Sequence, residues 1–228
     1  MGSDMGTNAS GSSSRAEILR RIRAAKGGAS DEASARSAWS WLDRRYRREA
    51  TRGREAVIDL LEDRLRDYDA HVVRVKIADV AATVAATVAA MLGERGKRRL
   101  VVPVGLPAEW LPGGFEFVVD EGFPAAELDG FEGVMTGATV AIAETGTVVL
   151  QNVAGQGRRA ASLVPDYHLC VVRVKDIVAT VPEAMDLLQR TAELATTFIS
   201  GPSATADIEM TRIKGVHGPR SLDVILAD

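Results

Sequence analysis

The 228-residue sequence has one cysteine, three histidines and few aromatic residues, which make up 5% of the chain. The single cysteine, Cys170, allows no intrachain disulfide, and no iron–sulfur cluster or cysteine-rich zinc site built from this chain alone. The histidines, His71, His168 and His217, lie far apart without the spacing of metal ligands. The sequence therefore predicts no metal site, and Cys170, which lies in an apolar run, is interpreted as a buried strand residue.

Long hydrophobic runs are also absent. The longest, Val80–Leu92, is interrupted by threonines and is shorter than the roughly 20 residues that a membrane-spanning helix needs. The Gly/Ser/Asn-rich start, residues 1–14, lacks the apolar centre of a secretory signal. We therefore expect a soluble cytoplasmic protein without a membrane span, with residues 1–13 as a disordered tail.

An excess of positive charge is likewise missing. The formal net charge is −3, which gives no general attraction to nucleic acid or to anionic lipid. The charge is uneven, because the first 100 residues hold 20 basic and 14 acidic side chains and the remaining residues hold 8 and 17. We interpret the basic half as a solvated helical face, and a docking surface for an acidic partner is the alternative.

The hydrophobic share of 46% and the charged share of 26% are typical of a globular protein. A capping box at Ser14–Glu17 predicts a helix over residues 15–26. A polar stretch follows, and residues 37–49 then mix tryptophan, tyrosine and arginine. We interpret 37–49 as an amphipathic helix that packs its aromatic rings inward, rather than as a nucleic-acid-binding segment. Residues 14–53 are predicted to form an N-terminal helical extension.

From residue 54 onward, the pattern alternates between helix and strand. Helical spacing covers residues 54–68 and 77–92, and a further helix passes through Met185 and Leu188; apolar strands are predicted at 70–76, 99–105, 115–119, 169–174, 196–200 and 222–226. Continuous apolar strands separated by helices predict a three-layer α/β/α domain with a mostly parallel sheet over residues 54–228. Residues 133–151 are expected to supply the inner part of this sheet and a tight turn.

Three glycine-punctuated segments, 143–147, 201–209 and 214–220, carry the polar residues that are candidates for chemistry. The second segment follows a predicted strand and offers Ser203 and Thr205 ahead of an expected helix. Backbone amides and hydroxyls at such a strand end suit a phosphate or a carboxylate. The alternative is that these residues serve only as a helix cap and a turn.

The other two segments place a carboxylate and an imidazole in turns. Glu144 is a candidate general base, nucleophile or acceptor for a ligand hydroxyl, and the alternative is that it accepts amides of its own turn. His217 lies between glycines near Arg220 and Lys214, which suit an anion. The alternative for His217 is a loop histidine bonded to a backbone carbonyl. His168, which follows Tyr167, is interpreted as structural.

Together these segments resemble the LutC/YkgG-type lactate-utilisation (LUD domain) family. The matching strings are Ala-Glu-Thr-Gly-Thr at 143–147, Gly-Pro-Ser-Ala-Thr-Ala-Asp-Ile-Glu at 201–209 and Gly-Val-His-Gly-Pro-Arg at 215–220. The resemblance runs from about Ser14 to the end and is weakest over 29–54. It implies a fold like that of ribose-phosphate isomerase and CoA transferases, and a role in oxidising L-lactate to pyruvate. It also implies iron–sulfur clusters on partner proteins, with no cofactor in this chain.

The leading hypothesis is therefore a cluster-free component of lactate utilisation that binds a small carboxylate or another anion. The candidate catalytic residues are Glu144 and His217, and the candidate ligand-binding residues are Thr145, Gly146, Thr147, Gly201, Ser203, Thr205, Asp207, Gly218 and Arg220. We expect positions 144, 203 and 217 to converge on one recess. The alternatives are a stand-alone isomerase- or CoA-transferase-like enzyme that uses Glu144 as base or nucleophile, and a non-catalytic assembly subunit.

Overall fold

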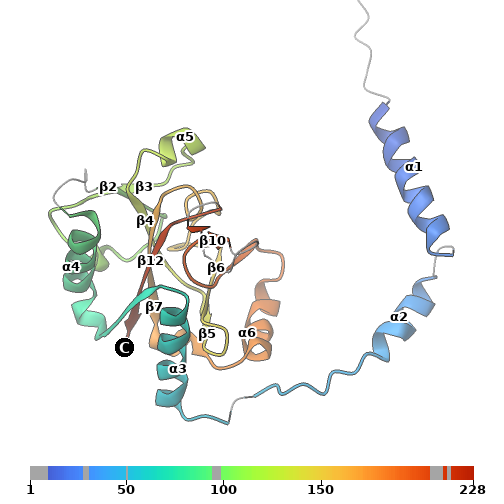
Figure 1. Cartoon of the computed structure of the whole chain (residues 1–228), viewed down its shortest axis with the longest axis horizontal. Helices are drawn as coiled ribbons and strands as arrows, with labels where there is room; N and C mark the ends of the chain where they lie inside the picture. Colours follow the sequence, from blue (N-terminus) through green and yellow to red (C-terminus); the bar gives the residue numbers. More distant parts are fainter. Residues whose placement is uncertain (1–9, 28–30, 50, 94–98, 206–212, 215–216) are drawn as a thin grey trace, which may run out of the picture. The chain divides into compact units, whose positions relative to one another are not determined.

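The computed structural model describes residues 10–27, 31–49, 51–93, 99–205, 213–214 and 217–228 (Figure 1). Contacts divide the chain into two compact units, Met1–Tyr46 and Arg47–Asp228. The first unit holds the helices α1 (Ser10–Ala25) and α2 (Glu32–Ser40). Within the described residues, no helix combines the length and apolar character that crossing a bilayer requires. The predicted boundaries at 13/14 and 53/54 stay predictions, although α1 already begins at Ser10.

The predicted helix over residues 37–49 is wrong. The helix α2 starts earlier, inside the polar stretch, because the Asp31 side chain accepts the Ser34 N–H at 2.6 Å and caps its first turn. It ends at Ser40, and the following residues form turns and extended backbone. Trp39 and Trp41 are 68% and 84% exposed in this unit, so the aromatic rings do not pack inward. The guanidinium of Arg44 lies over the Trp39 ring instead.

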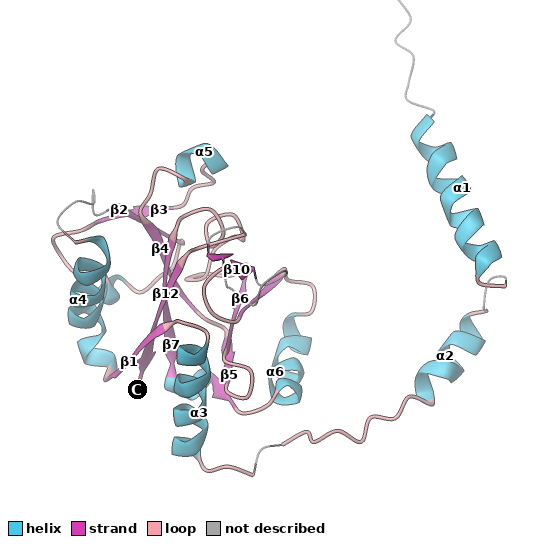
Figure 2. Cartoon of the chain, viewed as in Figure 1, coloured by secondary structure: helices cyan, strands magenta, loops and turns pink. Residues whose placement is uncertain are grey.

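The second unit alternates strands and helices, with short 3₁₀ helices labelled η (Figure 2). In chain order its elements are α3 (Arg54–Asp67), β1 (His71–Val75), η1 (Ile77–Asp79), α4 (Val80–Leu92), β2 (Arg99–Val102), η2 (Ala108–Trp110), β3 (Glu116–Val119), α5 (Ala125–Leu128), β4 (Gly133–Gly137), β5 (Val140–Ile142), β6 (Thr147–Gln151), β7 (Tyr167–Arg173), η3 (Val174–Asp176), β8 (Ile177–Val178), α6 (Val181–Leu188), η4 (Gln189–Thr191), β9 (Thr196–Ile199), β10 (Ala204–Thr205), β11 (Ile213–Lys214) and β12 (Ser221–Ala227).

The central sheet has six strands in the order β1-β12-β7-β4-β2-β3. Every neighbouring pair in it is parallel. The strands β7 and β12 lie inside this sheet and are buried along almost their whole length. Burial on both faces explains their continuous apolar sequences. The predicted mostly parallel sheet, flanked by helices in an α/β fold, is confirmed.

The prediction that residues 133–151 supply the inner part of this sheet and a tight turn holds for β4 and for the turn, and it is wrong for β5 and β6. The strand β4 does belong to it, but β5 and β6 pair antiparallel in a second sheet of order β8-β5-β6-β9. The partners β8 and β9 come from later in the chain, where β8 pairs parallel with β5 and β9 pairs antiparallel with β6. The tight turn between β5 and β6 does carry Glu144.

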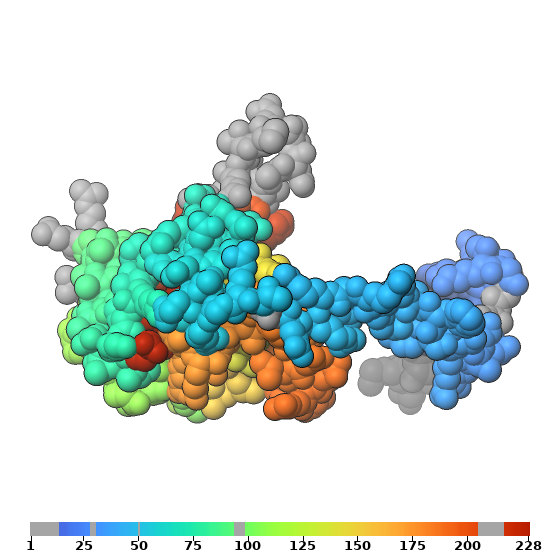
Figure 3. All heavy atoms as spheres, turned by 90° about the horizontal axis from the view of Figure 1, so that it is seen from below, coloured from blue at the N-terminus to red at the C-terminus, as the bar shows by residue number. Residues whose placement is uncertain are grey.

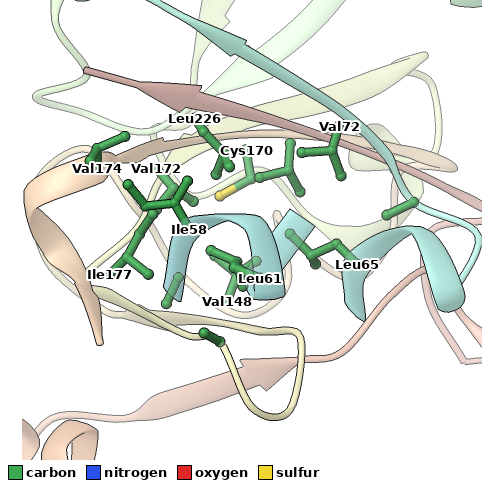
Figure 4. Close-up of a cluster of buried hydrophobic side chains, with 14 of the residues drawn as sticks. Ile58, Leu61, Leu65, Val72, Val148, Cys170, Val172, Val174, Ile177 and Leu226 are labelled. Atoms are coloured by element: carbon green, nitrogen blue, oxygen red, sulfur yellow. The ribbon is translucent and has the colours of Figure 1, made fainter. Parts of the chain in front are cut away.

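The two faces of the central sheet are covered differently. On one face, Val80, Val84 and Val88 of α4 lie four residues apart on one side of the helix and are fully buried against the sheet. On the other face lie α3 and the second sheet. Figure 4 shows this core, in which side chains of α3 meet those of β6, β7 and β12; they include Ile58, Leu61, Leu65, Val148, Cys170, Val172 and Leu226. Each such fully buried aliphatic side chain stabilises the fold by about 1.5–3 kcal/mol.

Candidate functional site

A short hairpin brings two of the three predicted segments together. The strands β10 and β11 pair antiparallel, so the chain before β10 and the chain after β11 return to the same place. The Ser203 N–H donates to the Pro219 carbonyl at 2.8 Å, and the His217 N–H donates to the Ser203 Oγ at 3.1 Å. Residues 201–203 and 217–219 therefore form one wall of a common site.

This arrangement differs from the expected strand end followed by a helix. Ala204 and Thr205 form β10, so no helix begins at Ser203 or Thr205, and the side chain of Thr205 and all of Asp207 lie outside what the structure describes. The preceding strand, β9, belongs to the antiparallel second sheet rather than to the parallel one. The loop lies beside the beginnings of β7 and β12, because His168 and Leu222 line the same cavity.

A cavity of about 240 Å³ lies against this wall. Its backbone contributions include Gly201 and Gly218, and its polar side chains are Arg159, Ser162, His168, Ser200, Ser203 and His217. Among the described residues that line it, none is an aspartate or a glutamate. The guanidinium of Arg159, with no carboxylate in the described lining, gives the cavity a positive character that suits an anion, and the hydroxyls and imidazoles add hydrogen-bonding groups.

His168 lies at the inner side of this cavity and is 1% exposed. Its Nε2 lies 2.8 Å from the Thr136 Oγ1. The Cys170 thiol donates to the Gly137 carbonyl, and the Thr136 hydroxyl donates to the Cys170 Sγ. The tautomer that carries its hydrogen on Nε2 satisfies both contacts, since Thr136 then accepts from the ring and donates its single hydroxyl hydrogen to Cys170, and this tautomer leaves the Nδ1 of His168 as a hydrogen-bond acceptor.

Burial, helped by the positive charge of Arg159, lowers the pKa of His168 to about 4. The ring is therefore neutral at pH 7. Its Nδ1 makes no hydrogen bond with any residue in the described part of the chain. A buried neutral acceptor that lines a cavity is well placed to receive the hydroxyl hydrogen of a ligand.

Arg159 supplies the positive charge of the cavity. Its Nη1 donates to the Ser162 Oγ at 3.3 Å, which orients the guanidinium within the loop between β6 and β7. The side chain is exposed apart from this contact, so most of its donors face solvent or the cavity. The sequence interpretation missed Arg159 and Ser162 and treated His168 as structural.

The first predicted segment touches this site only through its hydroxyls. The Thr145 Oγ1 lies 2.7 Å from the Thr147 Oγ1, which lies 2.8 Å from the Ser200 Oγ. Ser200 lines the cavity, whereas Thr145 and Thr147 do not. These two threonines therefore orient the hydroxyl of Ser200 without lining the cavity themselves.

Glu144 is not among the residues that line the cavity. Its carboxylate forms an ion pair with Arg47, and its backbone N–H donates to the Ala179 carbonyl at 3.0 Å. The neighbouring Gly146 has a φ of +58° and packs so tightly on Arg64 that a Cβ there would lie 2.8 Å from the Arg64 Cβ. The turn is thus packed against α3, and positions 203 and 217 converge without position 144.

Arg220 also points away from the cavity. Its Nε donates to both carboxylate oxygens of Asp166 at 2.8 Å, and its Nη2 contacts the same group. These two residues line a separate hollow with Tyr167 and Glu132, at the beginnings of β4 and β7. Arg220 is therefore held by an exposed carboxylate and does not contribute its charge to the cavity at Ser203 and His217.

Cys170 lies in β7 as a free, fully buried thiol, which confirms the interpretation of the sequence. Burial raises the pKa of this thiol to about 12, so it stays protonated. Within the described residues, no group of three or more histidine, cysteine or acidic side chains is arranged to hold a metal ion. The cofactor and cluster assignments stay predictions.

Comparison with known proteins now adds a family. The LUD domain model matches residues 127–227. Lactate utilization protein C of Deinococcus radiodurans is 44% identical over 176 residues, which cover 76% of this chain and 80% of that protein. Matches to lactate utilization protein C of Shouchella clausii and to the uncharacterized protein YkgG of Escherichia coli are shorter, with 38% and 37% identity over 41% and 40% of this chain.

The fold has a solved counterpart as well. The crystal structure of a DUF162 family protein from Deinococcus radiodurans superposes with a TM-score of 0.67 and 39% sequence identity. The superposition covers 78% of this chain and 99% of that one. The Deinococcus radiodurans relative matches three quarters of this chain, and the LUD domain model matches the carboxyl-terminal part of it. This chain therefore belongs to the LUD domain family.

Proposed function

We propose that this chain is a component of L-lactate utilisation that binds a small 2-hydroxy or 2-keto carboxylate in the cavity between Arg159, His168 and the wall formed by residues 201–203 and 217–219. Relatives that carry the name lactate utilization protein C support the metabolic role. The described lining of the cavity, which is basic and free of carboxylates, supports the ligand class. Its volume of about 240 Å³ is ample for a three-carbon acid.

Two groups would divide the recognition of lactate between them. The guanidinium of Arg159 would bind the carboxylate, since a planar fork of donors matches a carboxylate well. The Nδ1 of His168 would accept the hydrogen of the 2-hydroxyl group, because the neutral ring has its acceptor on that atom. This pairing of one cation with one buried neutral acceptor is the observation that carries the proposal.

His217 is the better of the two predicted candidates for moving a proton. It lines the cavity on its exposed side, and its backbone is tied to Ser203. Glu144 lies outside the lining and is paired with Arg47. In this proposal the electrons of lactate pass to iron–sulfur clusters on partner proteins in the cytoplasm, because one buried cysteine cannot hold a cluster.

Isothermal titration calorimetry of the full chain with L-lactate and with pyruvate tests the proposal. Arg159→Gln should weaken binding by about tenfold or more, since a charge-assisted contact is lost. Arg190→Gln, which changes an exposed arginine outside the cavity, is the matched control and should bind as the unchanged chain does. Absence of binding by both acids, or equal affinities in Arg159→Gln and the control, would contradict the proposal.

A further inference from the structure

The order of the strands creates a crevice at the carboxyl ends of the central strands, at the other end of the sheet from the cavity beside His168. The strands β2 and β4 are neighbours, but the chain leaving β2 passes outward to β3, whereas the chain leaving β4 enters the second sheet through β5 and β6 and reaches the inner strand β7 only afterwards. It also leaves toward opposite faces, since Trp110 after β2 packs on the α4 side and Ala141 after β4 packs on the α3 side. Ligands of open parallel sheets bind at such a reversal, outside the carboxyl ends of the strands.

A cavity of about 160 Å³ occupies this position. It is lined by residues that follow β2, including Gly105 and Trp110, by Gly137 at the end of β4, and by Arg173 and Asp176 at and after the end of β7. Figure 3 views the molecule from the side at which the C-terminus, just beyond β12, reaches the surface. The carboxyl ends of the parallel strands lie toward the same side (Figure 1).

Close backbone packing holds the walls of this crevice in place. The Gly155 N–H donates to the Val104 carbonyl at 2.8 Å, and the Gly137 N–H donates to the Gly155 carbonyl at 2.7 Å. Gly105 and Gly155 have φ values of +82° and +78°, and a Cβ on Gly105 would lie 2.8 Å from the Ala154 Cβ. These contacts need glycine, so the crevice is shaped before any ligand arrives.

Arg173 and Asp176 line the crevice as a cation and an anion, and the described residues show no ion pair between them. The Arg173 guanidinium lies over the ring of the buried Trp110, 5.6 Å from its centre. Asp176, half-buried, lies on the same lining. The Gln156 Oε1 accepts from the Thr139 hydroxyl and from the Gln151 N–H, which orients its amide group in the wall.

We propose that this crevice is a second ligand site, which takes a small hydroxylated anion. Arg173 binds the phosphate or carboxylate group of the ligand, and Asp176 accepts a hydrogen bond from one of its hydroxyls. The site is independent of the lactate cavity, because the two share no described lining residue. They lie at opposite ends of β7, where His168 and Arg173 are about 16 Å apart along the strand.

Calorimetry of the full chain with sn-glycerol 3-phosphate and with 3-hydroxypropanoate, neither of which is a 2-hydroxy or 2-keto carboxylate, tests this site and separates the two sources of the anion. Arg173→Gln should weaken binding of the preferred probe by about tenfold or more. Arg159→Gln, which alters the other cavity, and Arg190→Gln, an exposed control, should leave that affinity unchanged. This pattern is expected whether or not lactate binds elsewhere, so the two proposals fail separately.

The role of Asp176 is tested with a probe that lacks a carbon-bound hydroxyl. Asp176→Asn should weaken the binding of the hydroxylated probe more than the binding of inorganic phosphate. Three results would overturn the proposal: no binding of either hydroxylated probe up to about 10 mM, equal affinities in Arg173→Gln and Arg190→Gln, or a loss of binding in Arg159→Gln as large as that in Arg173→Gln. Thermal midpoints of each variant show that the fold is retained.

Discussion

His168 of β7 and Thr136 of β4 lie on neighbouring strands, with the imidazole Nε2 2.8 Å from the threonine Oγ1. The contact begins a chain of hydrogen bonds that continues through the Cys170 thiol to the Gly137 carbonyl. It fixes the ring of a fully buried histidine and satisfies one of its two nitrogens inside the sheet. The remaining nitrogen is therefore the one available to the cavity.

The buried ring makes stability depend on pH. The pKa of His168 falls from 6.5 to about 4 on folding, so between these values the unfolded chain binds a proton that the folded chain does not. The free energy of unfolding should therefore decrease as the pH is lowered from 6.5 to 4, by about 3 kcal/mol from this group. Urea unfolding across that range should show the slope reduced in His168→Asn and kept in His217→Asn, a change at an exposed histidine. Equal slopes in both variants would contradict it.

Asp223 should make the free energy of unfolding depend on pH in the opposite direction to His168. It is 6% exposed, accepts the Tyr167 hydroxyl at 2.7 Å and lies 3.3 Å from the His71 Nδ1. Burial outweighs these contacts and raises the pKa of Asp223. The folded chain then holds a proton more tightly than the unfolded chain, so stability falls as the pH rises from about 4.

Asp223→Asn removes this cost and still offers Tyr167 an acceptor. Its thermal midpoint should rise more between pH 4 and 7 than that of the unchanged chain, because the fall that Asp223 causes no longer offsets the rise that His168 causes, and at pH 7 it should be at least as high. Glu127→Gln in the exposed part of α5 serves as the control. A variant that is less stable than the unchanged chain at pH 7 would show that the carboxylate contributes more to the fold than its burial costs.

Glu144 provides a test of the alternative enzyme function. Because its carboxylate is paired with Arg47 and lies outside the cavity lining, Glu144→Gln should bind L-lactate with unchanged affinity. Mass spectrometry after incubation with acyl-CoAs should detect no glutamyl adduct at this position. A trapped adduct on Glu144 would instead favour a transferase with this residue as nucleophile.

Gly201 is a position where the backbone demands glycine. Its φ is +84°, and a Cβ there would lie 2.5 Å from the Tyr68 Cβ and 2.9 Å from the Tyr68 carbonyl oxygen. Gly114 has a similar φ of +89° with nothing within 4 Å, so it is a matched control for the conformational strain alone. Gly114→Ala should cost about 1 kcal/mol of stability, and Gly201→Ala should cost clearly more in urea unfolding. Similar costs would mean that the contact with Tyr68 is loose.

The parallel sheet is predictable from the sequence because its strands are buried on both faces. Continuous apolar runs such as Leu169–Val172 and Leu222–Leu226 leave no exposed side and are separated by helices. The second sheet gives no such signal. Its strands β5 and β6 are short and equally apolar, and their partners β8 and β9 follow more than twenty residues later. Which sheet a short apolar strand joins depends on these distant partners.

The candidate site also has a part that the sequence predicts and a part that it does not. The two glycine-rich segments near Ser203 and His217 are close in sequence and meet through a hairpin, which made their convergence predictable. Arg159 and His168 reach the cavity from a loop and a strand whose sequences carry no recognisable motif. A histidine in an apolar strand is most often structural, and only the cavity beside His168 indicates otherwise. The glutamate of the first segment was misplaced because packing of its turn on α3 turns it away.

The central claim is that a hydroxy acid meets the Nδ1 of His168 in the cavity beside Arg159. The direct measurement is the ¹⁵N chemical shift of the histidine side chains during titration of the labelled full chain with L-lactate. The account predicts that the Nδ1 signal of His168 moves as it accepts a hydrogen bond, that Nε2 of the same ring moves little, and that Arg159→Gln abolishes the change at equal lactate. A titration in which both His168 nitrogens stay fixed at saturating lactate would contradict it.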